Sequence, residues 1–323
     1  MRGRLVNRIT GLKFDEFETT MRGVRGHYIP VGSSTRDWQM HHVPLVDMDI
    51  MVGQNGGGAI YEGACHAGNF GLFIPLSEPG SLAVNGEQAG TTTLSWLVPE
   101  REFRVYNSDV FSWIGVSVAG ETVHQWLDLT HEDFRPDLHS HRIGAVEGAL
   151  MRRLQDIIQR MAGASDTGNA TMDDASQAML HAQLSWAIYE AVQSAGGARS
   201  AAQGRPRLSR GVVLGRALQW LETTDSDSIY MTDLCKVAGV SSRTLHAVFM
   251  ESFGVSPYRF LVLKRLRKIH DALKQAGPGD TVAGVCRRFG VWDFGRFSDV
   301  YRRVYGVLPS GVIASNRRAH PSH

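Results

Sequence analysis

The chain has 323 residues, of which 43% are hydrophobic and 20% charged, and this composition excludes a largely disordered or fibrous protein. Its length predicts two domains. The net charge of +2 hides an asymmetry, because residues 1–204 hold 15 Lys and Arg against 23 Asp and Glu, whereas residues 205–323 hold 19 against 9. The resulting charges of −8 and +10 predict that the C-terminal part meets a polyanion.

The three cysteines, Cys65, Cys235 and Cys286, include no CxxC pair and support neither a disulfide framework nor a cysteine zinc site. We expect them to be buried, reduced thiols. The first 18 residues lack the apolar core of a signal peptide, and no uncharged apolar run approaches the ~18 residues that span a bilayer. These features predict a cytoplasmic protein with no membrane partner.

Residues from about 24 to 119 form short apolar stretches separated by Gly, Pro, Asn and Ser, such as PLVDMDIMVG and DVFSWIGVSV. This pattern predicts a β-sandwich or barrel. The tract GQNGGG at 53–58 is expected to be a hairpin turn, because Asn and Gly supply the positive φ of tight turns. Trp38, Trp96 and Trp113 fit either a pocket lining or an aromatic core.

From about Ile143 the apolar period changes to 3.6, which predicts a helix, and a second helix is expected over Asp173–Ser194. Their apolar stripes could pack on the β-domain or on a second subunit, and the sequence leaves both open. The segment 196–207 is poor in large apolar residues and is expected to be a linker. The predicted domains are therefore residues 1–195 and 208–323.

The basic part begins with a helical stripe, which is followed by MTDLCKVAGVSSRTLHAVFMESFGVSPYRFL. In that segment a short helix is expected over Thr232–Ala238, with Thr232 as its cap, ending at Gly239. A second helix is expected to start after Ser241. Two helices joined by a short turn that contains Gly form a helix-turn-helix, whose second helix can lie in the DNA major groove.

The unit occurs twice. Cys235 and Gly239 recur 51 positions on as Cys286 and Gly290. Beyond the turn the matches lie 52 positions apart, so the second turn is one residue longer; they pair Leu245, Phe249, Phe253, Gly254 and Pro257 with Phe297, Tyr301, Tyr305, Gly306 and Pro309. A helix over Pro257–Gln275 is expected to join the copies. Its ~19 residues give roughly 28 Å, which is near the ~34 Å that separates successive turns of one groove.

Residues from about 208 to 318 resemble the DNA-binding domain of the AraC/XylS family of bacterial transcription regulators. The resemblance rests on LCKVAGVSSRTLHAVFMESFGVSPYRFL in the first unit and VAGVCRRFGVWDFGRFSDVYRRVYGVLPS in the second. The N-terminal half is similar to the sensing and dimerising halves of such regulators in layout alone. The resemblance implies an α+β multidomain fold with a cupin-like β-barrel domain, following helices and an all-α domain of two helix-turn-helix units.

In the first unit Leu245, Val248 and Phe249 fit the core, which leaves Ser242, Arg243, His246 and Ala247 on the outer face. The Arg243 guanidinium can make a bidentate contact with guanine, and the family resemblance places base contacts at Arg243, His246 and Ala247. A phosphate contact or a solvated charge is the alternative for Arg243.

In the second unit Phe297, Tyr301 and Tyr305 fit the core, and the outward residues are Arg296, Ser298, Asp299 and Arg302. Phe294 and Gly295 stand where the family often carries polar base-contacting side chains, which suggests looser contacts by this half. The candidates for phosphate contacts are Lys264, Arg265, Arg267, Lys268 and Arg303.

The histidines of the N-terminal half do not match the HxH-and-Glu pattern of metal-binding cupins, since HSH at 139–141 follows the β-region and HEDFR at 131–135 lacks a second His. No GxSxG elbow occurs, and GVSVA at 115–119 lacks the final Gly. We therefore expect no metal, no cofactor and no catalytic residue, and the chain is not expected to be an enzyme.

The sequence predicts a transcription regulator that binds double-stranded DNA, and the family resemblance implies an activator that contacts RNA polymerase. Control by a small-molecule effector or by self-association as a homodimer is expected in the N-terminal domain. Two alternatives stay open at this point. One is a cupin-type metal enzyme with a DNA-binding appendage, and the other is a ligand-independent regulator controlled by a protein partner.

Overall fold

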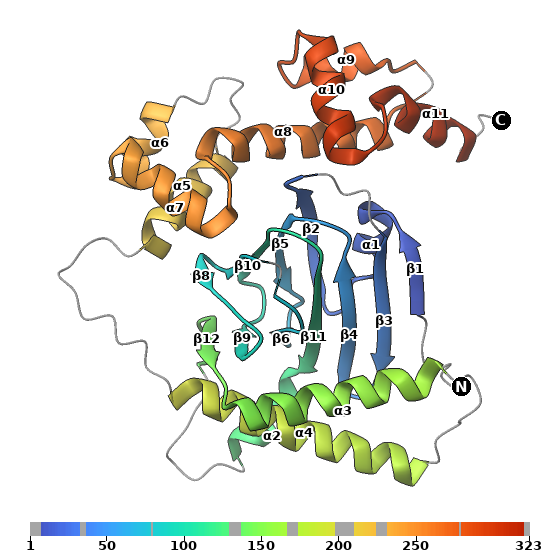
Figure 1. Cartoon of the computed structure of the whole chain (residues 1–323), viewed down its shortest axis with the longest axis vertical. Helices are drawn as coiled ribbons and strands as arrows, with labels where there is room; N and C mark the ends of the chain where they lie inside the picture. The colour runs from blue at the N-terminus through green and yellow to red at the C-terminus, as the bar shows by residue number, and fades with distance from the viewer. Residues whose placement is uncertain are drawn as a thin grey trace.

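The computed structural model describes residues 8–32, 37–78, 80–128, 137–166, 174–197, 210–223, 231–277 and 279–319. Two parts follow one another along the chain (Figure 1), a β-rich N-terminal domain and a helical C-terminal region. This layout confirms the predicted α+β multidomain class.

The larger sheet of the N-terminal domain has seven strands, and each pair of neighbours is antiparallel. Its strands lie in the order β1 (Arg8–Leu12), β3 (Trp38–Pro44), β4 (Met48–Asn55), β11 (Phe111–Ala119), β6 (Asn69–Pro75), β9 (Thr93–Leu97) and β12 (Arg142–Ala145).

The smaller sheet faces the first and is also antiparallel. Its strands lie in the order β2 (Val24–Pro30), β5 (Ala59–Cys65), β10 (Glu102–Asn107), β7 (Leu82–Val84) and β8 (Glu87–Gln88). Both sheets run from one edge strand to another, so the N-terminal domain consists of two facing sheets that do not close into the continuous barrel that the resemblance implied.

The glycine tract at 53–58 does not form a hairpin, and that prediction is wrong. It connects β4 of the larger sheet to β5 of the smaller one, and its glycines do not adopt positive φ. Glycine is needed there for space, because a Cβ on Gly58 would lie 2.5 Å from the carbonyl oxygen of Ser108. The tract therefore lets the chain cross closely between the two sheets.

Alternation along β11 separates two apolar cores. Trp113 points between the sheets, whereas Ile114, Val116 and Val118 contribute to the core beneath the long helices. These helices are α3 (Gly148–Asp166) and α4 (Asp174–Gly197), which pack on each other and on the larger sheet (Figure 1). The sequence left open whether the apolar stripes of these helices pack on the β-domain or on a second subunit. The structure shows that one face of the helix pair packs on its own β-domain.

Three short elements were not anticipated by periodicity. Ile143 lies in β12, which pairs with β9, so the helix begins later than its apolar spacing predicted. The other two are α1 (Phe14–Thr20), which buries Phe14 and Phe17, and α2 (Gly120–Asp128).

The C-terminal region repeats one arrangement. Its helices are α5 (Arg210–Thr223), α6 (Met231–Ala238), α7 (Ser242–Phe253), α8 (Pro257–Lys274), α9 (Val282–Arg288), α10 (Phe294–Tyr305) and α11 (Pro309–Ala319). The repeat places a left-handed glycine in each turn, at Gly239 (φ 70°) and Gly290 (φ 68°), and another after each second helix, at Gly254 (φ 62°) and Gly306 (φ 72°). The doubled helix-turn-helix and its joining helix are confirmed.

Two sequence expectations about boundaries have different outcomes. Thr232 is not a cap, because it lies inside the first turn of α6. The predicted linker falls outside the described residues apart from Gly196 and Gly197, which belong to α4, so the domain division stays a prediction.

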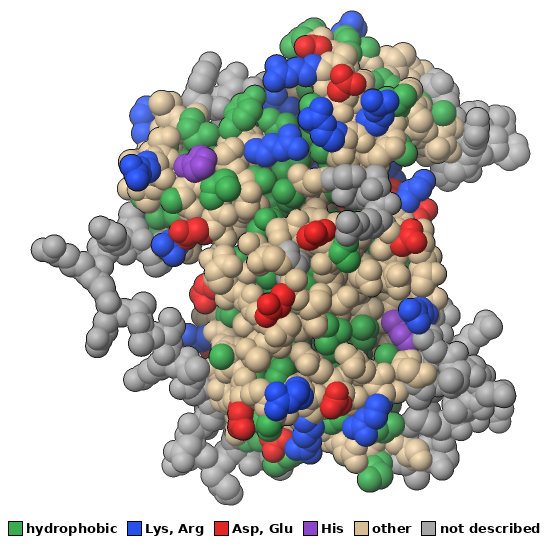
Figure 2. Space-filling model, in the orientation of Figure 1, with side chains coloured by type: hydrophobic (Ala, Val, Ile, Leu, Met, Phe, Trp, Pro, Cys, Tyr) green, Lys and Arg blue, Asp and Glu red, His purple; other side chains and the backbone are tan. Residues whose placement is uncertain are grey.

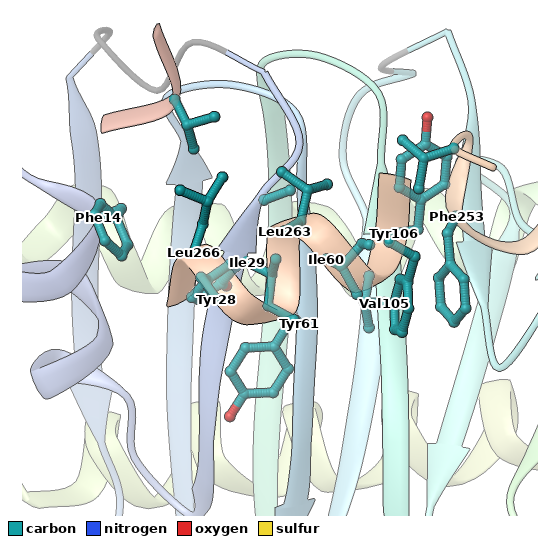
Figure 3. Packing of buried hydrophobic residues seen from close by; sticks show 14 of the residues in the cluster. Phe14, Tyr28, Ile29, Ile60, Tyr61, Val105, Tyr106, Phe253, Leu263 and Leu266 are labelled. Carbon is teal, nitrogen blue, oxygen red and sulfur yellow. The ribbon is translucent and has the colours of Figure 1, made fainter. Parts of the chain in front are cut away.

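The helical region packs directly on the smaller sheet. Helix α8 contacts β2, and α7 contacts β7, β8 and β10. Figure 3 shows Leu263 and Leu266 of α8 beside Ile29 and Ile60, and Phe253 beside Tyr106. One apolar core therefore continues from the β-domain into the helix-turn-helix region.

Candidate nucleic-acid interface

The first recognition helix, α7, has well-defined ends. The Ser241 hydroxyl accepts a hydrogen bond from the Thr244 backbone N–H at 3.2 Å, and Gly254 ends the helix in the left-handed conformation. Leu245, Val248 and Phe249 are buried, as their spacing predicted. The cap and the buried stripe together fix which face of α7 points outward.

That outward face carries the predicted reading residues. Ser242, Arg243, His246 and Ala247 are all exposed even though the N-terminal domain is docked nearby. Arg243 and His246 stand one turn apart, so they can address neighbouring positions of a groove. The structure thus brings together the four residues of the first unit, and their contacts with bases stay a prediction.

The second recognition helix, α10, follows the same plan with different chemistry. The Asp293 carboxylate caps it by accepting a hydrogen bond from the Arg296 N–H at 3.0 Å, and Phe297, Tyr301 and Tyr305 are buried. The predicted outward residues Arg296 and Arg302 are exposed, and Ser298 is half-buried. The two recognition helices stand near opposite ends of α8 (Figure 1).

Basic side chains gather over the C-terminal helices in the view of Figure 2, with apolar side chains among them. Lys268, Arg302 and Arg303 are exposed. Two other candidates are placed differently: Arg267 is buried, which rules it out as a phosphate contact in this arrangement, and the Lys264 ammonium lies 3.1 Å from Glu62 of the β-domain.

Three cations of α8 pair with carboxylates of the N-terminal domain, and we name this set the α8 clamp: Arg267–Glu18, Lys264–Glu62 and Lys274–Asp15. Arg267 contacts both Glu18 oxygens and also donates to the Tyr28 carbonyl at 2.7 Å. Because both side chains are nearly buried, this bidentate pair is the most strongly shielded from water of the three.

Glu62 is the centre of a charge cluster on the clamp. Its carboxylate lies 3.0 Å from Arg104, 3.1 Å from Lys264 and 3.5 Å from His27. Burial favours the neutral acid, but these contacts with His27, Lys264 and Arg104 outweigh burial and hold the pKa of Glu62 well below its ordinary value. Glu62 is therefore ionised throughout the neutral range.

Asp15 plays the same part at the C-terminal end of α8. Its carboxylate accepts a hydrogen bond from Lys274 at 2.7 Å, and His270 Nε2 lies 3.9 Å away. Burial favours the neutral acid, yet the neighbouring His270 and Lys274 hold the pKa of Asp15 well below its ordinary value. The middle and the C-terminal end of α8 are thus tied to the N-terminal domain by ionised carboxylates.

An apolar cavity lies between the two sheets. None of the described residues that line it is charged, and they include Tyr28, Tyr61, Phe73, Phe103 and Trp113. Of the three tryptophans on β-stretches, Trp113 therefore lines the cavity, whereas Trp38 and Trp96 are core residues.

The polar groups of this cavity differ in their partners. Trp113 Nε1 donates to Asn55 Oδ1, and Asn55 Nδ2 donates to Asn107 Oδ1, both at 3.0 Å. The buried Tyr61 hydroxyl has no hydrogen-bond partner among the described residues, and Figure 3 shows it pointing away from α8. Burial raises the pKa of Tyr61, so the group stays a neutral donor.

His141 of the β-domain has a structural role. His141 Nδ1 accepts a hydrogen bond from the Val98 N–H at 3.1 Å, so its Nε2–H donates to the Glu102 carbonyl at 2.9 Å. Burial lowers the pKa of His141, in keeping with a neutral ring. The segment HEDFR at 131–135 lies outside the described residues.

Across the described ranges, no three His, Cys, Asp or Glu side chains are grouped closely enough to hold a metal ion. Likewise, no helix in the described part of the chain is long and apolar enough to cross a membrane. Of the three cysteines, Cys65 and Cys286 are buried as expected, whereas Cys235 is only half-buried, and all three are free.

Sequence reasoning missed the clamp carboxylates and the cavity. Asp15, Glu18 and Glu62 lie more than 200 residues from their partners on α8, so no local spacing signals the pairs. The one available signal was the helical periodicity of α8, which places Leu263, Leu266 and Arg267 on one face. A cation on an apolar face requires a partner.

A comparison with protein families matches residues 234–315 to a helix-turn-helix domain. The C-terminal region is also similar to curated regulators. These include a probable thc operon regulatory protein of Rhodococcus erythropolis, 30% identical over 30% of this chain and 30% of that protein, and the HTH-type transcriptional activator RhaS of Escherichia coli, 29% identical over 31% and 35%. A third is the XylDLEGF operon transcriptional activator 2 of Pseudomonas putida, 25% identical over 32% of this chain and 66% of that protein.

The matched segment therefore spans less than two thirds of each of these relatives. Among solved structures, the AraC-like transcriptional activator CuxR is 15% identical, with a TM-score of 0.42 over 83% of this chain and 96% of that one. ToxT from Vibrio cholerae is 11% identical, with a TM-score of 0.33 over 83% and 98%.

Proposed function

We propose that this chain, whose residues 234–315 form a helix-turn-helix domain of the AraC/XylS type, is a sequence-specific transcription regulator that acts as an activator in the cytoplasm. The observation that carries the proposal is the presence of two capped recognition helices near the two ends of one rigid helix, each with an exposed outer face. Such a pair can enter successive segments of the major groove.

The proposed DNA contacts divide between the two units. In α7, Arg243, His246, Ser242 and Ala247 face the bases, and in α10, Arg296, Ser298 and Arg302 face the bases or the phosphates. Lys264 is a conditional contact, because its ammonium must leave Glu62 before it can bind a phosphate.

The cavity between the sheets is the proposed effector site. Its uncharged lining and the unpartnered Tyr61 hydroxyl favour a neutral, largely apolar molecule that offers one hydrogen-bond acceptor. A carboxylate ligand would find no cation there among the described lining residues.

Tyr28 joins this cavity to the DNA-binding region. Its side chain lines the cavity, while its backbone carbonyl accepts from Arg267 and its N–H donates to Glu18. A ligand that displaces Tyr28 would therefore disturb the Arg267–Glu18 pair directly. Through that pair, occupancy of the cavity would change how α8 holds the two recognition helices.

Self-association is the second proposed control. Helix α4 exposes Met179 and Trp186, whose relative exposures are 64% and 53%. Since the opposite face of α4 already covers the β-domain, these side chains suit a contact with a second copy of the chain. Contact with RNA polymerase is proposed from the activator names of the relatives alone.

The test is selection of duplex DNA from a random pool by the full chain, followed by titration of the selected sequence at several salt concentrations. We expect one enriched motif with repeated half-sites and an affinity that falls steeply with salt, because phosphate contacts release counterions. Failure to retain any duplex at low salt would refute the DNA-binding proposal.

Two further measurements test the alternative functions. Stoichiometric metal in the purified protein would favour a metal enzyme. An unchanged melting temperature across a panel of neutral metabolites would favour control by a protein partner.

A further inference from the structure

The two helix-turn-helix units differ by one inserted residue. In the first unit the turn glycine Gly239 is followed by Val240 and then by the cap Ser241. In the second unit Gly290 is followed by Val291, by Trp292 and only then by the cap Asp293. Since the helices that follow align residue for residue, Trp292 is the added residue, and it lies directly before α10.

Trp292 is strongly exposed. Its relative exposure of 72% exceeds that of every other large apolar side chain described in the C-terminal region. Exposed tryptophan is costly in water and is typical of binding surfaces, because its large ring offers much apolar area at little cost in conformational freedom. The insertion therefore places a large aromatic side chain in front of the recognition helix.

The first turn of α10 adds a second aromatic side chain, Phe294, after Trp292, and we name these two residues the apolar head. Phe294 is half-buried, with the Arg287 guanidinium 5.5 Å above its ring, and Gly295 adds no side chain. A Cβ at Gly295 would meet only the Asp293 carboxylate, at 3.8 Å, so the space outside this turn is open. The first two positions of α10 consequently present no hydrogen-bonding side chain to a base edge.

Cations are exposed on the two helices that flank this apolar head. Arg287, Arg288, Arg296 and Arg302 are exposed on α9 and α10. A partner that suits the surface must combine high negative charge with an apolar group at its centre. Duplex DNA meets both requirements, because thymine carries a C5-methyl group in the major groove between two rows of phosphates.

We propose that Trp292 packs against the C5-methyl group of a thymine. The second unit then recognises this methyl group, whereas α7 recognises the hydrogen-bonding edges of bases. The inference rests on the proposed DNA-binding function. It assigns the specificity of the second unit to an inserted aromatic residue, and Phe294 supports Trp292 from the first turn of α10.

The experiment uses the full chain and the duplex that it selects from a random pool. Each thymine of that duplex is replaced in turn by uracil, which lacks only the methyl group, and binding is measured for the wild type and for Trp292→Ala. One replacement in one half-site is expected to weaken wild-type binding by about fourfold, the effect of burying one methyl group. Trp292→Ala should bind the thymine duplex more weakly and should be insensitive to that same replacement.

Val307→Ala is the matched control, because Val307 is another exposed apolar residue and lies beyond the opposite end of α10. It should keep the uracil sensitivity of the wild type, and all three proteins should have the same melting temperature. Equal uracil sensitivity in the wild type and Trp292→Ala, or unchanged affinity of Trp292→Ala, would overturn the proposal and assign Trp292 to a protein contact. A wild-type chain that selects no sequence would overturn the DNA-binding function itself.

Discussion

At the scale of single residues, the two recognition helices are specified by short-range chemistry. Ser241 and Asp293 cap them, and Gly254 and Gly306 end them with positive φ that other residues rarely adopt. These signals are local, so the first of the two caps and the repeat itself were predictable. What the local signals leave open is which groups lie against the exposed faces.

Arg243→Ala tests the first recognition helix. The exposed guanidinium can make two hydrogen bonds with one guanine, so its removal is expected to cost ~1–3 kcal/mol and to relax preference at one base pair. Binding titrations with the selected duplex and its single-base variants measure both effects. Equal weakening on every sequence would show that Arg243 contacts a phosphate.

Gly254→Ala tests the contact between α7 and the β-domain. Gly254 has φ +62°, and a Cβ there would lie 1.8 Å from the Tyr106 hydroxyl oxygen. We expect a loss of more than about 1 kcal/mol in the free energy of unfolding, from backbone strain and displacement of Tyr106. Gly215→Ala is the control, because Gly215 lies inside α5 with nothing within 4 Å, and it should stabilise the protein by about 0.5–1 kcal/mol. Denaturant unfolding compares the two.

At the scale of elements, α8 has two roles. One face places Leu263 and Leu266 on the smaller sheet, and its ends carry the two helix-turn-helix units. The cations predicted along it for phosphate contact are divided by this packing: Lys268 remains exposed, whereas Arg267 and Lys264 pair with the N-terminal domain. The charged run on α8 thus supplies domain contacts and leaves Lys268 free of them for the proposed phosphate contact.

The pKa of Glu62 predicts how this contact depends on pH. The folded protein holds that pKa well below its ordinary value of 4.5, so the ionised carboxylate stabilises the structure fully above pH 4.5. As pH falls below 4.5 the unfolded chain takes up the proton first, and the stabilisation is lost progressively.

Glu62→Gln provides the measurement. The difference in unfolding free energy between the wild type and Glu62→Gln should be constant from pH 7 to about pH 5.5 and should shrink in more acidic solution. A difference that stays constant down to pH 3 would show that Glu62 contributes through packing and not through its charge.

At the scale of the whole molecule, the N-terminal and helix-turn-helix regions form one structure in which a single apolar core and the α8 clamp cross the domain contact. The faces of α7 that are proposed to read DNA remain exposed in this docked arrangement. The N-terminal domain therefore contacts α8 and leaves uncovered the face of α7 that is proposed to read DNA.

Arg267→Ala tests the docking of the two regions. Removing one partner of a nearly buried ion pair leaves the Glu18 carboxylate uncompensated, at a cost on the order of 3–5 kcal/mol. We expect a larger radius of gyration in small-angle scattering and faster hydrogen exchange along α8. Lys268→Ala, which removes the exposed cation next to Arg267, should change neither quantity; an equal response in both variants would argue against the clamp.

The sequence by itself determined the elements that depend on local order: the two helix-turn-helix units, their buried stripes, the helix that joins them, and a β-rich first half. It also revealed the opposite charges of the two halves, although not that three cations of the basic half would be paired with carboxylates of the acidic half. Periodicity placed Ile143 in a helix, and the Asn and Gly residues placed the tract 53–58 in a hairpin, because neither of these local signals reports hydrogen-bond partners. Only the tertiary structure decided the strand partners, the cavity around Tyr61 and the clamp on α8, since each of these joins residues far apart in the chain, and such contacts depend on how whole elements pack.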